Sequence, residues 1–278
     1  MLPNLLIIGG IRCATGWMLE CLREHPQVFG AEEETHFFDR NFERGTTWWE
    51  QAHFGGYAGQ PVVVEKTANL LSHREAPRRI HETLPEARLI CSLRDPIARL
   101  YSDYLRFHYD RSYGVLEACE RHPEIVERGL YARHLQGFLK HFQHERVMIN
   151  IYEDRAADPA AFMRRIYRFA CVDPDFRAAR LETLVKPGAP EVRGLAVKAL
   201  YFLQATQWAP QFLKSLHYRI RNRYYQALPF TGAEIDRLRA YFAEDIAQLE
   251  ALLGRRLDCW LARTPDPAAG VAAPMAGA

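Results

Sequence analysis

The sequence predicts an α/β fold in three layers, with a central parallel sheet flanked by helices and a further helical segment toward the C-terminal end. Four apolar runs have the length and composition of buried strands, at residues 4–10, 61–66, 87–94 and 146–154. The runs are continuous rather than alternating, as expected for strands that are covered on both faces. Helical patterns lie between them, and strands that alternate with helices favour a parallel sheet.

Four helices are expected between and after these strands, at residues 15–24, 96–107, 131–141 and 159–169. In the first helix, Met18, Leu19 and Leu22 fall on one face, which can pack on the sheet. The second helix has Asp95 at the N-cap position and a proline as its first residue, which is the usual place for proline in a helix.

The composition changes after residue 187, but we expect residues 1–264 to form one domain. Residues 194–230 have a helical pattern rich in aromatic and basic residues. A closing helix is expected within residues 231–260, since Thr231 and Glu234 form a capping box and Gly254 can end the helix. Its apolar stripe consists of Ile235, Leu238, Phe242, Ile246, Leu249 and Leu253. Residues 265–278 are small and proline-rich, which predicts a disordered tail.

Composition excludes several classes of protein. The formal net charge of +2 is too small for a dedicated nucleic-acid binder, and no apolar run reaches the roughly 18 residues that span a bilayer. No signal peptide precedes the first strand, so we expect a cytoplasmic protein without membrane association. The six cysteines form no CxxC pair and are expected to be reduced, with Cys21, Cys91 and Cys171 in the core.

The loop after the first strand resembles a phosphate cradle. A Walker A motif fails here because Trp17, not lysine, follows Gly16, and a G-x-G-x-x-G fingerprint is absent. What remains is a strand, small residues and a helix start, where backbone N–H groups and the helix dipole favour an anion. Thr15 adds a hydroxyl and Arg12 a forked cation. The residues alone leave open an ordinary turn with an incidental arginine.

A second basic position follows another strand. Arg94 leaves a buried strand at its carboxyl end, which is where open α/β sheets bind ligands. Ser102 lies about two turns into the following helix and offers a hydroxyl to the same ligand. This pair suits a second phosphate, although a structural salt bridge of Arg94 is the alternative.

In order and spacing, these motifs resemble the donor-binding signatures of sulfotransferases that use 3'-phosphoadenosine 5'-phosphosulfate (PAPS), in particular the heparan-sulfate-type and bacterial branch. The run Arg12-Cys13-Ala14-Thr15-Gly16 corresponds to the family loop Lys-x-Gly-Thr-Thr, and "LRDPIARLYSDY" holds the arginine and serine of the second signature. The segments "EETHFFDRNFERGTTWWEQAHF" and "VEKTANLL" agree with it as well. The likeness extends from residue 4 to about residue 170 and implies a P-loop-like fold with PAPS as co-substrate. Departures of the loop from the family pattern include Arg12 and Gly16.

The resemblance also implies roles for single residues. The donor-binding set comprises Arg12, Cys13, Ala14, Thr15, Gly16, Trp17, Arg94, Ser102 and, in a basic loop, Arg193. Glu34 corresponds to the general base and Lys66 to a lysine that faces the sulfuryl group, while Arg12 stabilises the leaving phosphate. His36 is a rival base by its ordinary pKa near neutrality, or orients groups nearby. We expect Glu65 to pair with a neighbouring cation, and no metal is implied.

The acceptor is not specified by the sequence. We expect a hydroxyl, less often an amine, of a small-molecule, carbohydrate or lipid-like compound. We expect its site to be lined by three segments, residues 40–60, 105–130 and 194–230, of which the last is an acceptor-side insertion. The aromatic residues of the first two segments include Trp48, Trp49, His53, Phe54, Tyr57, His108, Tyr109 and Tyr113. The alternatives are a P-loop-type kinase and a non-catalytic nucleotide-binding module of the same fold. The oligomeric state stays open.

Overall fold

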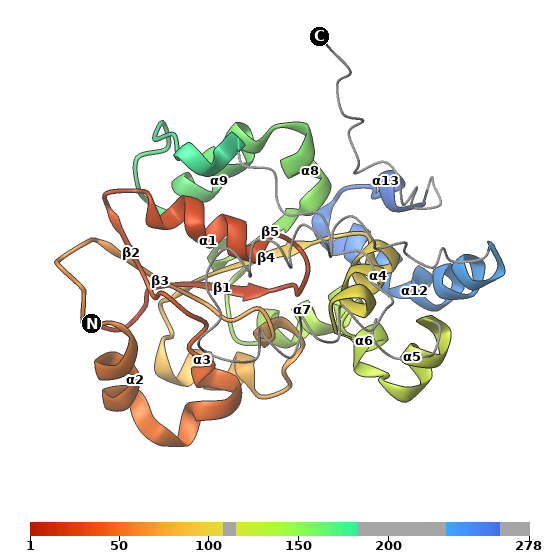
Figure 1. The fold of residues 1–278 in the computed structure, drawn as a ribbon, viewed down its shortest axis with the longest axis horizontal. Coiled ribbons are helices and arrows are strands. Elements are labelled where there is room, and N and C mark those ends of the chain that lie inside the picture. Colours follow the sequence, from red (N-terminus) through yellow and green to blue (C-terminus); the bar gives the residue numbers. More distant parts are fainter. Residues whose placement is uncertain (108–114, 183–231, 262–278) are drawn as a thin grey trace, which may run out of the picture.

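A computed structural model of the chain describes residues 1–107, 115–182 and 232–261. A five-stranded sheet lies at its centre, in the order β2-β3-β1-β4-β5 (Figure 1). All neighbouring strands are parallel. The strands are β1 (Leu5–Gly9), β2 (Val28–Gly30), β3 (Val62–Lys66), β4 (Arg88–Leu93) and β5 (Val147–Ile151). The predicted parallel sheet is therefore confirmed.

Two details of the sheet were not predicted correctly. The short edge strand β2 was missed, because three residues give no apolar run long enough to recognise. The strand predicted over 146–154 ends at Ile151, and helix α8 (Tyr152–Ala157) begins directly after it. The polar sequence from residue 152 to 155 is therefore helical, and this change places Tyr152 and Arg155 at the edge of the sheet.

Helices cover both faces of the sheet (Figure 1). On one face α1 (Thr15–Arg23) and α9 (Pro159–Ala170) bury their apolar stripes against Leu5 and Ile7. On the other face, Leu6 and Ile8 join a larger core with residues from α2 (Gly45–His53), α3 (Ala76–Thr83), α4 (Pro96–Phe107), α5 (Val115–Arg121), α6 (Glu124–Glu127), α7 (Tyr131–Leu139) and α12 (Gly232–Leu253). A last turn of helix, α13 (Asp258–Leu261), follows.

The closing helix α12 packs on α7 and α4. Five residues of the predicted stripe, from Ile235 to Leu249, are buried, and Leu253 is partly buried against the same core. Asp245 on α12 accepts hydrogen bonds from the backbone N–H groups of Ala132 and Arg133, each at 3.0 Å, and so caps the start of α7. Thr231 of the predicted capping box lies outside the described residues, as do the segment 194–230 and the tail 265–278.

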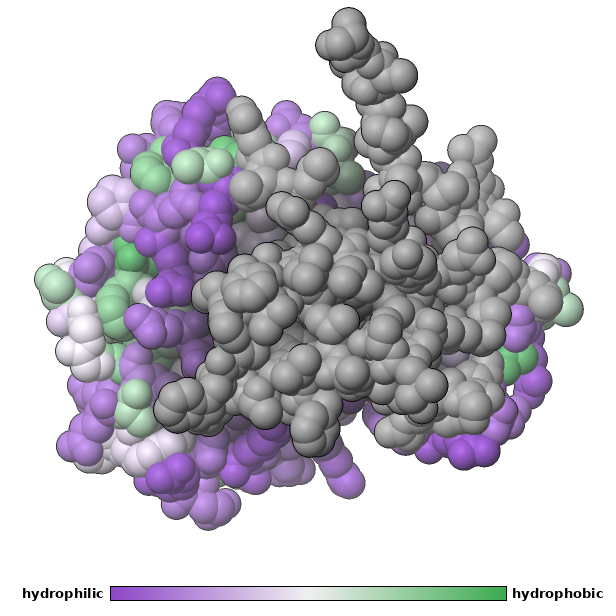
Figure 2. Space-filling view, viewed as in Figure 1, coloured by the Kyte–Doolittle hydropathy of each residue, from purple (hydrophilic) through white to green (hydrophobic). Residues whose placement is uncertain are grey.

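All six cysteines lie within the described residues and none forms a disulfide, as expected. Cys21 and Cys91 are buried, but Cys171 is exposed, so its assignment to the core was wrong. The reason is that Cys171 ends α9 in a left-handed conformation, with φ of 58°, beyond the apolar stripe of the helix. On the face shown in Figure 2, hydrophilic side chains predominate over the described surface that is visible.

Candidate active site

Three neighbouring strands bring the predicted residues to one edge of the sheet. β1 pairs with β3 on one side and with β4 on the other, and all three run in the same direction. Their carboxyl ends are therefore adjacent. Arg12 follows β1, Lys66 is the last residue of β3, and Arg94 follows β4.

The loop after β1 is held close to the sheet. Two of its residues, Arg12 and Ala14, have left-handed backbone conformations with φ of 65° and 63°. Cys13 is fully buried, and burial raises the pKa of its thiol to about 12, so it is neutral at physiological pH. The buried Thr15 starts α1. A Cβ atom added at Gly16 would meet no atom within 4 Å, so the threonine of the family pattern would also fit there.

Arg12 connects the loop to helix α4. Its Nε atom donates a hydrogen bond to Oγ of Ser102 at 3.0 Å, and Ser102 is 7% exposed. The sequence placed these residues beside two different phosphates, and the structure adds a direct contact between their side chains. A guanidinium held by a buried hydroxyl at the edge of the sheet is preorganised for an anion.

A second group of residues surrounds the aromatic ring of Tyr152. The guanidinium carbon of Arg94 lies 4.8 Å from the centroid of this ring, and that of Arg155 lies 4.9 Å from it. Arg155 is also 4.9 Å from the ring of Trp17, whose Nε1 donates to the carbonyl of Arg180 at 3.0 Å. Trp17 and Arg94, both predicted from the sequence, are thus linked through two residues that the sequence reasoning missed.

The carboxylates near these arginines are engaged elsewhere. Glu153 accepts hydrogen bonds from the Asp95 backbone N–H at 3.2 Å and from the Trp260 indole at 3.0 Å. Asp154 makes two 2.7 Å bonds to Arg255, which lower the pKa of its carboxyl. Within the described part of the chain, Arg94 and Arg155 make no ion pair. Two guanidinium groups that are not held in ion pairs at one sheet edge favour an anionic ligand.

Glu34, Lys66 and His36 come together beside the end of β3. The Lys66 ammonium contacts Oε1 of Glu34, and Nε2 of His36 lies 3.6 Å from Oε2 of the same carboxylate. The other ring nitrogen of His36 lies 2.9 Å from Asp39, which is 5% exposed and was not predicted from the sequence. The side chain of Glu34 is 30% exposed, so it remains accessible to a substrate.

Glu65 is buried and does not pair with a cation, so the predicted ion pair was wrong. Successive residues of a strand point to opposite faces, and Glu65 points away from the face of Lys66. Its Oε1 accepts hydrogen bonds from the hydroxyl groups of Thr35, at 3.1 Å, and Thr67. Burial raises the pKa of the Glu65 carboxyl to about 7, against the opposing effect of these hydroxyl groups.

Two of the aromatic residues expected near an acceptor belong to the core instead. Trp49 is fully buried, with its ring stacked on that of Phe37 at 4.3 Å between centroids, and Phe54 is 3% exposed. Trp48 is only half-buried, and the guanidinium carbon of Arg44 lies 3.8 Å from the centroid of its ring. A periodic aromatic pattern does not separate packing residues from binding residues, because both kinds recur on one helix face. His108, Tyr109, Tyr113 and Arg193 lie outside the described residues.

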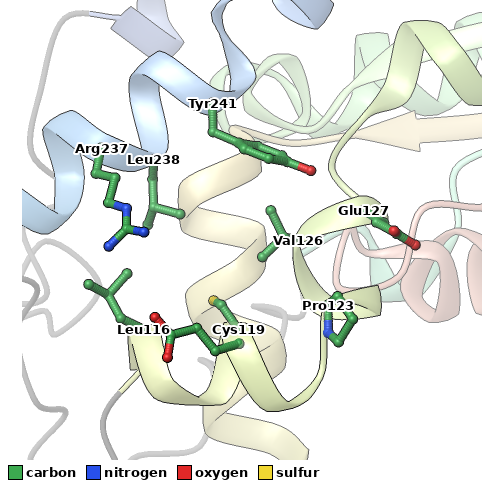
Figure 3. Close-up of a pocket in the computed structure, with 9 residues that line it drawn as sticks. Leu116, Cys119, Pro123, Val126, Glu127, Arg237, Leu238 and Tyr241 are labelled. Carbon is green, nitrogen blue, oxygen red and sulfur yellow. The ribbon is translucent and has the colours of Figure 1, made fainter.

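A cavity of about 250 Å³ lies elsewhere, between α5, α6 and α12 (Figure 3). Its lining is mainly apolar and contains none of the predicted catalytic or donor-binding residues, although six of its nine residues belong to the segment 105–130 that was expected near the acceptor. The lining consists of Leu116, Cys119, Glu120, Pro123, Val126, Glu127, Arg237, Leu238 and Tyr241. Among the residues that the structure describes, no cluster of His, Cys, Asp and Glu is arranged to hold a metal ion. No helix in those same ranges has the length and apolar character to cross a membrane.

The chain is similar to known sulfotransferases. Residues 2–186 match the family model described as "Sulfotransferase domain". Over 183 residues the chain is 34% identical to mouse heparan sulfate glucosamine 3-O-sulfotransferase 3B1, covering 60% of this chain and 46% of that protein. It is also 34% identical over 178 residues to human heparan sulfate glucosamine 3-O-sulfotransferase 6, covering 60% and 52%. The chain thus spans about half the length of the curated relatives it matches.

Solved structures agree in fold. A sulfotransferase from Alicyclobacillus acidocaldarius matches with a TM-score of 0.69 and 22% identity, covering 94% of this chain and 99% of that one. Mouse sulfotransferase SULT7A1, solved in complex with PAP, matches with a TM-score of 0.52 and 12% identity, covering 91% and 89%. At these identities the likeness shows a common fold.

Proposed function

The chain belongs to the sulfotransferase family, and from that membership we propose that it transfers the sulfuryl group of PAPS to a hydroxyl group. The observation that carries the proposal is the arrangement at the sheet edge. The ion pair of Glu34 and Lys66 at the end of β3 lies one strand away from the loop in which Arg12 contacts Ser102. A proton acceptor and an anion site are thus presented from adjacent strands.

Donor binding is assigned to the loop and to the second basic group. The amide groups of residues 13–17, the hydroxyl of Thr15 and the guanidinium of Arg12 would hold the 5'-phosphosulfate. Arg94 and Ser102 would hold the 3'-phosphate, with Trp17 beside the nucleotide. Arg193, outside the described residues, is proposed to cover the donor.

The proposed reaction is an in-line displacement. The acceptor oxygen attacks sulfur, its proton passes to the Glu34 carboxylate, and the bond from sulfur to the 5'-phosphate oxygen breaks to release 3'-phosphoadenosine 5'-phosphate. Arg12, held by Ser102, would face the phosphate that gains charge. One such preorganised donor contributes about 3 kcal/mol of transition-state stabilisation. Since an arginine stays protonated, this help is electrostatic rather than a proton transfer. Lys66 would hold a sulfuryl oxygen, and His36 would orient Glu34.

For the acceptor we propose a glycan hydroxyl first. The relatives are named for transfer to heparan sulfate glucosamine, which supports a carbohydrate for this chain. An amine, a phenol or a lipid-like alcohol remains the second choice. We also propose a cytoplasmic location, supported by six free cysteines, because disulfides are rare in reducing compartments. Cell fractionation with an antibody to the chain tests this location.

Two experiments test the proposed function. Calorimetry with 3'-phosphoadenosine 5'-phosphate and, separately, with ATP and Mg²⁺ should show binding of the first ligand only. Radiolabelled sulfate transfer from PAPS to a panel of glycans, phenols and long-chain alcohols then seeks the acceptor. Glu34→Ala should lower kcat by about 100-fold or more, while Glu33→Ala, at the exposed neighbouring position, should leave it within about twofold.

The two alternative functions, a kinase and a non-catalytic nucleotide-binding module, predict different results in these experiments. Binding of ATP and Mg²⁺ without the bisphosphate nucleotide would favour a kinase. Binding of the bisphosphate nucleotide with no transfer to any acceptor, and none to water, would favour a non-catalytic module.

A further inference from the structure

A buried network ties residues 34–37 to the end of β3. Glu65 is 1% exposed, and the threonines that bond to it, Thr35 and Thr67, are 2% and 0% exposed. Both hydroxyl groups meet the same oxygen of Glu65. The backbone N–H of His36 lies 3.3 Å from the Thr67 hydroxyl, and that of Phe37 lies 3.3 Å from the Thr35 hydroxyl.

The direction of every bond in this network follows from donor chemistry. A backbone N–H can only donate, so both hydroxyl oxygens act as acceptors toward the chain. Each hydroxyl has a single proton, which is then directed to the Glu65 oxygen. Glu65 is therefore the final acceptor of two short chains of hydrogen bonds that begin at the backbone of His36 and Phe37.

Strand β3 and the segment of residues 34–37 contact each other on both faces of the sheet. Val62 and Val64 belong to the core on one side of the sheet and Val63 to the core on the other, so Lys66 and Glu65 point in opposite directions. The side chains of the consecutive residues Glu34 and Thr35 also lie on opposite faces. Glu34 contacts Lys66 on one face, and Thr35 bonds to Glu65 on the other.

The backbone at His36 needs this support. Its φ of 49° lies in the left-handed region, where the Cβ atom of a residue with a side chain crowds the following carbonyl oxygen. Such a conformation persists only where the surroundings hold it. The bond from the His36 N–H to Thr67 provides one such restraint.

We propose that Glu65 is a positioning residue: through Thr35 and Thr67 it sets the backbone that places Glu34 against Lys66 and His36 beside Glu34. At 1% exposure Glu65 does not touch substrate, so its effect on catalysis passes through these residues. In its catalytic consequence this inference rests on the proposed function. Its structural content, that the network holds the contact between Glu34 and Lys66, can be tested separately.

The test removes one hydroxyl at a time. Thr67→Val keeps the shape of the side chain but not the hydroxyl, and Thr67→Ser keeps the hydroxyl; Thr35→Val and Thr35→Ser repeat the comparison. Glu65→Gln retains an oxygen acceptor but cannot ionise. Thr83→Val, whose hydroxyl bonds to a carbonyl within α3, is the matched control for the same substitution away from the site.

Two measurements are made on each variant. Crystal structures give the separation of Lys66 Nζ and Glu34 Oε1. We expect more than about 4 Å, the limit for an ion pair, in Thr67→Val and an intact contact in Thr67→Ser and Thr83→Val. Sulfuryl transfer should show kcat lowered by about 10-fold to 100-fold in Thr67→Val and restored within about threefold in Thr67→Ser. The dissociation constant for 3'-phosphoadenosine 5'-phosphate should stay within about twofold throughout, because the donor loop is separate.

Three results would overturn the inference. One is an intact contact with unchanged kcat in Thr67→Val and Thr35→Val; another is an equal loss in the valine and serine variants, which would show that the hydroxyl is not the cause. The third is a fall in nucleotide affinity as large as the fall in kcat, which would indicate general damage. If the wild-type protein neither binds the nucleotide nor transfers sulfate, the proposed function fails, and the crystal structures alone decide whether the network holds the contact.

Discussion

Replacing Glu65 by glutamine should remove a pH-dependent part of the free energy of unfolding. The carboxyl is 1% exposed, and burial raises its pKa from 4.5 to about 7 in the folded protein. Between these two values the folded state retains a proton that the unfolded state has already lost. The unfolded state therefore binds fewer protons, and the stability of the folded state must fall as the pH rises through this window. Glutamine fills the same volume and does not titrate.

The magnitude follows from the difference in pKa. A difference of about 2.5 pKa units corresponds to about 3 kcal/mol over the whole titration, of which about 2.5 kcal/mol falls between pH 5 and pH 8. The quantity to measure is the free energy of unfolding of the wild type minus that of Glu65→Gln. This difference should be largest at pH 5 and should decrease by about that amount at pH 8.

Urea denaturation followed by tryptophan fluorescence at several pH values provides the assay. Other groups with shifted pKa values, such as Asp154 and Asp245, are present in both proteins, so their contributions cancel in the difference. A difference that stays constant within about 0.5 kcal/mol from pH 5 to pH 8, or one that increases with pH, would refute the assignment of a neutral, buried carboxyl.

Three further predictions concern the donor site and the core. Arg12→Ala should lower kcat for sulfuryl transfer by about 100-fold, because it removes the guanidinium that Ser102 holds, and steady-state kinetics would contradict this if kcat stayed within threefold. Arg155→Leu should weaken binding of 3'-phosphoadenosine 5'-phosphate by about tenfold and reduce its salt dependence, since one of the two guanidinium groups beside Tyr152 is lost. Calorimetry at two salt concentrations checks this, and unchanged affinity would exclude Arg155 from the donor site. Phe242→Ala should lower the free energy of unfolding by about 3–5 kcal/mol, because the side chain is fully buried where α12 joins the core, and a loss below 1 kcal/mol in urea denaturation would mean that this helix contributes little.

The layered fold followed from local patterns in the sequence. Continuous apolar runs such as residues 61–66 and 87–94 became buried parallel strands, and the stripe from Ile235 to Leu249 became the buried face of α12. These patterns work because burial on one or both faces constrains every residue of an element in the same way. The strand β2 was missed because it has three residues, and the end of β5 was misplaced because Tyr152 favours a strand by its propensity.

The main residues of the candidate site were also indicated by the sequence, but their contacts were not. Motif order indicated Glu34, Lys66 and Arg94, and strand ends explained why they meet at one edge. No pattern indicated that Asp39 would bond to His36 or that Arg155 would lie over Tyr152. Such contacts depend on side-chain directions in segments that are not neighbours in the sequence.

Glu65 and Lys66 separate what the sequence determines from what the tertiary structure decides. They are adjacent in the sequence and of opposite charge, and the sequence alone determined that both stand at the end of a buried strand. Only the tertiary structure decided that one is a buried acid held by two hydroxyl groups and the other an accessible partner of Glu34. The physical reason is that alternation along a strand assigns the two residues to opposite faces, while the elements packed on each face determine whether a charge is solvated, paired or suppressed.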